Sequence, residues 1–163
     1  MNKLAPWLVC LAAILSVCGP ASARAADYGQ AMVNPLSLAE RELADENRGD
    51  VAGALALYAD DALVQYGGLC WEPCVGKAAI QKELERRVAA KNVWKVVGSY
   101  VSGNVAVVQT ELKIGFIEYT GVDHVVVWCI YEVVGDKIAT VRLVGQLTDP
   151  GTQRFVRYGK PPK

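Results

Sequence analysis

The stretch that decides the fold is LYADDALVQYGG, residues 57–68. An apolar helical pattern ends in its first residues, two acids follow, and DALVQY then has the composition of a β-strand. We interpret Asp60 and Asp61 as residues that end the helix and cap the turn into this strand. Tyr66 closes the strand just before a pair of glycines. The stretch therefore predicts a helix-to-strand junction, and the flanking sequence supplies the rest of the fold.

Three helices are predicted around this junction. The first spans residues 34–50, where Asn34 or Ser37 can act as the N-cap and apolar residues recur at helical spacing. A glycine ends this helix, and Asp50 can cap the second helix, which reads DVAGALALYA. The third helix follows a loop with two cysteines and reads GKAAIQKELERRVAAK, residues 76–91.

Four further strands are predicted after the third helix, because runs rich in Val, Ile, Thr and aromatic residues alternate with the turn sequences SGN, TGV and GDK. They are NVWKVVGSYV (92–101), VAVVQTELKIGFIEY (105–119), DHVVVWCIYEVV (123–134) and IATVRLVGQL (138–147). Helices first and an antiparallel meander after them indicate an α+β domain over residues 36–147. We expect residues 26–35 to be an N-terminal lead and residues 148–163 a loosely ordered tail.

The strand from Asp123 to Tyr131 is apolar on both faces. Alternate residues of a strand point to opposite sides of the sheet. One face carries Asp123, Val125, Val127, Cys129 and Tyr131, and the other carries His124, Val126, Trp128 and Ile130. The helices can cover one of these faces, and a second subunit can cover the other. We therefore expect a homodimer that forms through the sheet face.

The order of these elements resembles the NTF2-like, or cystatin-like, α+β roll, and is most similar to its SnoaL-like and ketosteroid-isomerase-like members. The resemblance rests on GDVAGALALYADDALV, GKAAIQKEL, VDHVVVW and GDKIATVRLV. It implies a fold in which N-terminal helices pack on a curved antiparallel sheet. It does not by itself imply one activity, because this fold carries many unrelated functions.

The resemblance to the isomerases implies three candidate catalytic positions. In those enzymes a carboxylate abstracts a proton beside a ketone, while a tyrosine and a protonated carboxylic acid bind the oxyanion. The protonated acid corresponds to Asp123, the base to Tyr66 and the tyrosine to Glu42. Only the first position keeps its residue type. A rearranged set of two carboxyls and a phenol still offers a cofactor-independent isomerase, cyclase or dehydratase.

Each of these three residues also has a plainer interpretation. Glu42 lies in a charge-rich part of the first helix and can be a solvated surface charge, and Asp123 can simply begin a strand. Tyr66 is a poor base, because a phenol is protonated at neutral pH. We therefore favour a noncatalytic domain whose apolar pocket binds a small hydrophobic molecule, with a structural or interaction domain as a third possibility. The candidate ligand-binding residues are Tyr66, Trp71, Leu112, Ile114, Val125 and Val127.

The first 25 residues predict a secretory signal peptide. A basic start at Lys3 precedes the apolar run LAPWLVCLAAILSVCG, and ASARA offers a cleavage pattern of small residues. We expect cleavage after Ala23 or Ala25 and a periplasmic or secreted protein. An uncleaved membrane anchor, or a lipoprotein modified at Cys18, are the alternatives.

The cysteines of the mature chain suit an oxidising compartment. Cys70 and Cys74 flank a short loop and are expected to form a disulfide, while Cys129 lies in an apolar run and is expected in the core. A metal site is not expected, because His124 is the only histidine. No phosphate loop, dinucleotide fingerprint or nucleophile motif appears, so we expect no cofactor.

The charge of the chain is balanced, with 17 basic and 17 acidic residues. This balance gives no reason to expect a nucleic-acid partner. After the signal peptide no segment is apolar enough to span a membrane, so we expect no membrane partner either.

Overall fold

The computed structural model describes residues 33–67, 72–115 and 117–158. All of them belong to the compact unit Met32–Lys163. The elements are α1 (Pro35–Asn47), α2 (Val51–Ala56), β1 (Tyr58–Gly67), β2 (Cys74–Val75), α3 (Lys77–Ala89), β3 (Val93–Ser102), β4 (Val105–Lys113), the 3-10 turn η1 (Ile117–Thr120), β5 (Val125–Val134), β6 (Lys137–Gly145) and α4 (Pro150–Tyr158). The predicted α+β class is therefore confirmed, while the predicted signal peptide lies outside the described residues.

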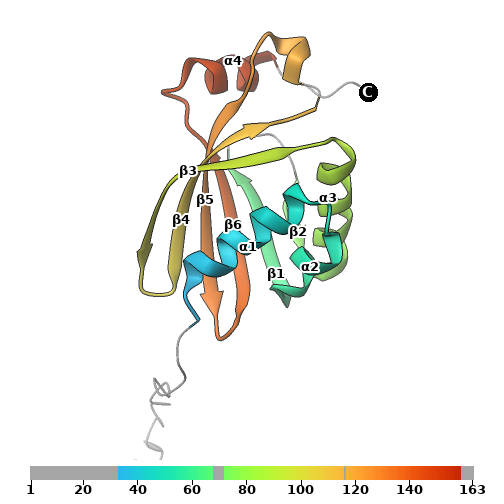
Figure 1. The fold of residues 1–163 in the computed structure, drawn as a ribbon, viewed down its shortest axis with the longest axis vertical. Helices are drawn as coiled ribbons and strands as arrows, with labels where there is room; N and C mark the ends of the chain where they lie inside the picture. Colours follow the sequence, from blue (N-terminus) through green and yellow to red (C-terminus); the bar gives the residue numbers. More distant parts are fainter. Residues whose placement is uncertain (1–32, 68–71, 116, 159–163) are drawn as a thin grey trace, which may run out of the picture. The chain divides into compact units, whose positions relative to one another are not determined.

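The strands form one six-stranded sheet in the order β2-β1-β6-β5-β4-β3. The meander β3 to β6 is antiparallel throughout, as the sequence predicts. β1 joins the sheet beside β6, and this pair is parallel. Figure 1 shows α1 lying across one face of the sheet, with α2 and α3 near β1 and β2. Within the described residues no helix is long and apolar enough to cross a membrane.

The start of α1 and the junction after it follow local sequence signals. The Asn34 side chain accepts a hydrogen bond from the backbone of Leu36 at 3.0 Å, and Asp50 caps α2 by accepting one from Gly53 at 2.8 Å. Gly49 lies between the helices with φ of +74°, a conformation that favours glycine. The predicted caps of both helices are thus confirmed.

The predicted end of the second helix is wrong. α2 has six residues, and the strand already begins at Tyr58, so Asp60 and Asp61 are exposed residues of β1 and not helix caps. Tyr58 pairs with Ile138 of β6, and the register between β1 and β6 shifts between Tyr58 and Leu63. This irregularity accommodates the two acids in the strand.

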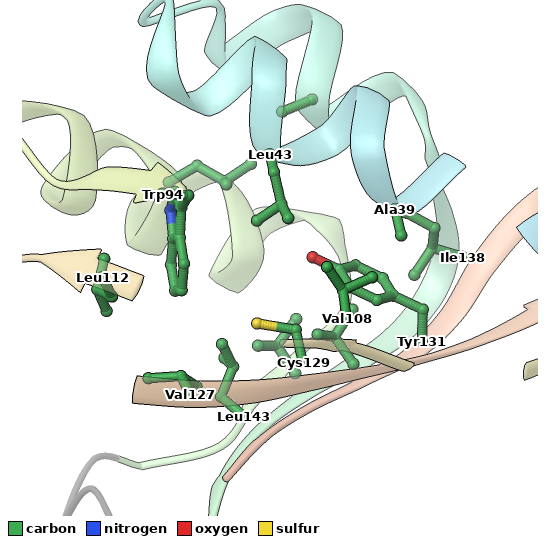
Figure 2. Packing of buried hydrophobic residues seen from close by; sticks show 14 of the residues in the cluster. Ala39, Leu43, Trp94, Val108, Leu112, Val127, Cys129, Tyr131, Ile138 and Leu143 are labelled. Carbon is green, nitrogen blue, oxygen red and sulfur yellow. The ribbon is translucent and has the colours of Figure 1, made fainter. Parts of the chain in front are cut away.

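The hydrophobic core lies between the helices and the inner face of the sheet. Figure 2 shows Ala39 and Leu43 of α1 above Val108, Cys129 and Tyr131 of the sheet. Cys129 is fully buried, as predicted. The core continues along the sheet through Trp94, Leu112, Val127, Ile138 and Leu143.

The outer face of the sheet is much less covered. His124, Val126, Trp128 and Ile130 are half-buried, while the alternate residues of β5 are buried. Tyr100 is 59% exposed and Val144 is 39% exposed. Because Tyr100 pairs with Val107 and Val144 with Trp128, they lie on this same outer face. The predicted two-sided apolar strand is confirmed, and its cover by a second subunit stays a prediction.

The predicted loosely ordered tail, residues 148–163, contains a helix in its described part. Residues 150–158 form α4, whose first turn is capped by Asp149 accepting a hydrogen bond from the backbone of Thr152 at 2.6 Å. The Thr152 hydroxyl in turn accepts a hydrogen bond from the backbone of Val126 at 2.7 Å, and Phe155 is buried. An acid followed by proline at the first helical position is a helix-start signal.

Candidate functional site

Glu42 lies at the centre of a buried cluster. It is 2% exposed, so its interpretation as a solvated surface charge is wrong. Its two carboxyl oxygens accept hydrogen bonds from the hydroxyls of Tyr58 and Tyr131, each at 2.9 Å. We call these three residues, contributed by α1, β1 and β5, the tyrosine cluster.

Burial at the centre of the tyrosine cluster favours a protonated carboxyl group on Glu42. Burial raises the pKa of Glu42 to about 7, with a further contribution from the nearby Glu46 that Arg87 and the two tyrosines partly offset. Burial also raises the pKa of Tyr58 and Tyr131 well above the usual value, so both stay as donors. Glu42 therefore holds its proton in conditions where an exposed glutamate is ionised.

Arg87 of α3 is the centre of a second buried cluster and is 5% exposed. Its Nη1 lies 3.2 Å from Oε2 of Glu46, and its Nε donates to Oε1 of Glu83 at 3.0 Å. Its guanidinium also donates to the Tyr66 hydroxyl and lies 5.8 Å from the centre of the Trp94 ring. We call these five residues the arginine cluster.

The arginine cluster keeps Arg87 and Glu83 charged. Burial alone would lower the pKa of Arg87, but Glu46 and the surrounding acidic groups and tyrosines raise it well above its usual value. Burial would raise the pKa of Glu83, but hydrogen bonds from Arg86 and Tyr66 and the charge of Arg87 hold it at about 2. The ion pair between Arg87 and Glu46 therefore ties α3 to α1, and the hydrogen bonds of the Tyr66 hydroxyl tie β1 to α3.

Tyr66 belongs to this second cluster and not to that of Glu42. Its hydroxyl donates to Oε1 of Glu83 at 2.6 Å and accepts from Arg87. Burial is the main reason that the pKa of Tyr66 is raised, and this change opposes any role as a base.

Asp123 lies apart from both clusters. It is an exposed residue of the bend before β5, which begins at Val125 and not at Asp123. Tyr131, whose hydroxyl binds Glu42, lies six residues beyond Val125 along β5. At the usual rise of a strand this is a distance of roughly 20 Å from the start of β5, and Asp123 lies before that start. The structure therefore does not bring Asp123, Glu42 and Tyr66 together at one point.

A pocket of about 370 Å³ opens between α3 and the β1–β2 pair. It is lined by Tyr66, Glu72, Pro73, Cys74, Ala79, Lys82, Glu83 and Arg86. Tyr66 is the predicted ligand-binding residue that this pocket contains, and Trp71 lies outside the described residues. The other four, Leu112, Ile114, Val125 and Val127, belong to the hydrophobic core.

The sequence analysis missed the contribution of α3 to this pocket. Ala79, Lys82, Glu83 and Arg86 follow one another at the i, i+3, i+4, i+7 spacing of a single helix face. That spacing is visible in the sequence, but the face holds three charged residues and would ordinarily be assigned to solvent.

The predicted disulfide concerns the same region. Cys74 is half-buried on the pocket wall, and Cys129 is a free thiol in the core. Cys70 lies outside the described residues, so the bridge to Cys74 stays a prediction. Among the residues that the structure describes, no group of three His, Cys, Asp or Glu side chains could hold a metal ion.

Comparison with known families places these features in one domain type. The profile of the SnoaL-like domain matches residues 39–141, which include both buried clusters and the pocket. The chain belongs to the SnoaL-like domain family. The resemblance to SnoaL-like proteins is thereby confirmed at the level of family. No curated protein matches the chain significantly.

Solved structures similar to this SnoaL-like domain confirm the fold. An NTF2-like protein of unknown function from Cytophaga hutchinsonii is 10% identical, with a TM-score of 0.59, and the match covers 73% of this chain and 96% of that one. An epoxide hydrolase/cyclase-like enzyme with a role in pyran ring formation in salinomycin is 15% identical, with a TM-score of 0.61 and coverage of 71% and 92%. A candidate ketosteroid isomerase from Kribbella flavida is 19% identical, with a TM-score of 0.59 and coverage of 79% and 83%. The SnoaL-like domain is thus related in fold to cyclases and isomerases.

Proposed function

We propose that this domain binds a small, largely apolar molecule in the pocket between α3 and the β1–β2 pair, without chemical conversion. The observation that carries the proposal is a pocket of about 370 Å³ whose wall includes Tyr66, with its hydroxyl held by Glu83 and Arg87. This volume lies within the range of about 300–1,000 Å³ that is usual for small-molecule sites.

The lining of the pocket indicates the kind of molecule. Pro73, Cys74, Ala79 and the Tyr66 ring offer apolar contact. Lys82 stands at the exposed rim and forms no ion pair with another described residue. A ligand with an apolar body and one polar or anionic end suits this arrangement, because polar groups in such pockets mainly fix orientation.

Catalysis is the weaker alternative, because its candidate groups are engaged or distant. An isomerase or cyclase needs acid and base groups that reach one bound carbonyl compound. Both oxygens of Glu42 accept hydrogen bonds from tyrosines, the pKa of Tyr66 is raised, and Asp123 is exposed at the far end of β5. Binding in the pocket, in contrast, does not require Glu42, Tyr66 and Asp123 to reach the same bound molecule.

The test fills the pocket with a side chain. Ala79→Trp places an indole in the pocket, while Ala78→Trp adds the same group at the neighbouring exposed position outside it. The probe is 1-anilinonaphthalene-8-sulfonate, an apolar aromatic with one anionic group, followed by fluorescence titration of the mature protein. We expect wild type and Ala78→Trp to bind alike and Ala79→Trp to bind at least about tenfold more weakly. Equal affinity for Ala79→Trp, or no binding to wild type, would contradict the proposal.

We also propose that the protein is exported before it binds this molecule. The support is the basic, apolar and small-residue pattern of residues 1–25. Fractionation of the producing cells and N-terminal sequencing should give a chain that starts at Arg24 or Ala26 in the periplasm or the medium. A chain that starts at Met1 in the cytoplasm would contradict export.

A homodimer through the outer sheet face completes the proposal. The support is the row of apolar side chains there, with Trp128 and Ile130 half-buried and Tyr100 and Val144 exposed in the single chain. Light scattering should give twice the chain mass, and Ile130→Asp should give the monomer. A monomeric wild type would contradict this interface.

A further inference from the structure

The charges of the chain are divided unevenly along its length. Residues 26–149 contain 17 acids and 11 bases, whereas residues 150–163 contain four bases and no acid. The four bases are Arg154, Arg157, Lys160 and Lys163, spaced three residues apart. An otherwise acidic chain thus ends in a basic segment, and such asymmetry is typical of contact with a polyanion or a membrane surface.

The first two of these bases lie on α4, and the structure holds this helix in place. Thr152 and Phe155 are buried, and Thr152 is hydrogen-bonded to the backbone of β5. Arg154 and Arg157 are on the exposed side, and neither forms an ion pair with a described acid. The helix therefore presents two uncompensated positive charges on a fixed element.

The same exposed side also carries an aromatic ring, because Tyr158 is 64% exposed. The Arg157 guanidinium lies 5.9 Å from the centre of the Tyr158 ring, so a cation and an aromatic ring stand side by side on the surface. Basic residues combined with exposed aromatic and apolar residues are characteristic of segments that lie at the membrane interface.

We propose that the exposed side of α4, formed by Arg154, Arg157 and Tyr158, docks on the surface of a membrane that contains anionic phospholipid. The bases pair with lipid phosphates, and the tyrosine ring enters the headgroup region. The acidic remainder of the chain is repelled by the same surface, so the basic end faces the lipid. A nucleic acid fits less well, because it offers no apolar layer for the tyrosine ring.

This inference revises the expectation of no membrane partner. That expectation rested on the lack of a second apolar span, and docking at a surface needs no span. The inference is also independent of the proposed pocket, because α4 contributes no residue to it. Either proposal can fail while the other holds.

The experiment measures binding of the mature chain, residues 26–163, to vesicles. Flotation compares phosphatidylcholine vesicles with vesicles that contain about 30% phosphatidylglycerol, at low and high salt. We expect binding to the anionic vesicles alone, and loss of binding at high salt because screening weakens these contacts. Arg154→Gln with Arg157→Gln should reduce the partition coefficient about 30-fold, since each base contributes about one factor of five at such a surface.

Two further variants keep the test decisive. Lys91→Gln with Lys113→Gln removes the same charge from exposed positions outside α4 and should reduce partitioning far less. Tyr158→Ser keeps the charge and should also weaken binding. Unchanged far-UV circular dichroism and melting temperature establish that each variant is folded, and Tyr158→Ser serves if the arginine variant is not. Equal binding to neutral vesicles, an equal loss in the Lys91 and Lys113 variant, or binding to a DNA oligonucleotide without binding to vesicles would overturn the proposal.

Discussion

The tyrosine cluster and the arginine cluster lie side by side in the protein and treat a glutamate carboxyl group in opposite ways. Glu42 is fully buried beside two neutral donors, and burial raises its pKa to about 7. Glu83 is half-buried and is held by Arg86, Arg87 and Tyr66, which together keep its pKa at about 2. The residue type is the same, and the depth of burial and the partners together decide whether the proton is kept. A cation within hydrogen-bonding distance offsets the cost of burial, while hydroxyl groups do so only in part.

The largest expected effect comes from removing the cation of the arginine cluster. Arg87→Met keeps the bulk of the side chain but leaves Glu46 and Glu83 without their buried partner. We expect a loss of about 3–5 kcal/mol in the free energy of unfolding, measured by urea denaturation at pH 7. Arg41→Met removes an exposed arginine 3.7 Å from Asp45 and is the control, with an expected loss of about 1 kcal/mol or less. Equal losses of unfolding free energy in the two variants would show that the buried ion pairs of Arg87 stabilise the protein no more than an exposed ion pair does.

The second effect concerns the proton on Glu42. Because the pKa is raised from 4.5 to about 7, the folded protein binds one proton more than the unfolded chain between these values. The stability that depends on this proton is therefore complete below about pH 4.5 and is lost as the pH rises through 7. Glu42→Gln cannot ionise, so we expect it to exceed wild type by roughly 3 kcal/mol at pH 8, with the difference shrinking towards pH 5. Urea denaturation at several pH values checks this, and parallel profiles for the two proteins would show that Glu42 is ionised when folded.

The smallest effect has the opposite pH dependence. The pKa of Glu83 is lowered to about 2, so its contribution is present above pH 4.5 and is lost as the pH falls through 2. Glu83→Gln should cost roughly 1–2 kcal/mol at neutral pH, after allowance for solvent screening, and much less at pH 2. Glu85→Gln, at an exposed position of the same helix, is the control and should change little. A cost for Glu83→Gln that is the same at pH 2 and pH 7 would mean that its ion pairs do not set the stability.

Where local signals are strong, the sequence predicted the fold correctly. Asn34 and Asp50 cap their helices through contacts within three residues, and the strands of the meander alternate in burial as their sequence does. The junction between α2 and β1 could not be found in this way. Tyr58 belongs to β1 and not to α2, because it pairs with Ile138 and donates a hydrogen bond to Glu42. Both partners lie in distant parts of the chain.

The candidate site was predicted only in part, for the same reason. Tyr66 lies in the first strand on the wall of a pocket, and Glu42 is buried and not solvated, while the roles predicted for both residues stay predictions. Arg87 was not recognised, because a basic residue in a charged helix gives no local sign of burial. Asp123 was selected by resemblance, but the strand begins two residues later and leaves it exposed.

The sequence by itself determined the α+β class, the helix caps, the two-sided apolar strand and the family resemblance, because each depends on neighbours within a few residues or on a repeating pattern. Only the tertiary structure decided which charges are buried. Glu42 meets Tyr131 across 89 residues, and Arg87 meets Glu46 across 41 residues. Such contacts set burial and therefore protonation, and no local pattern contains them.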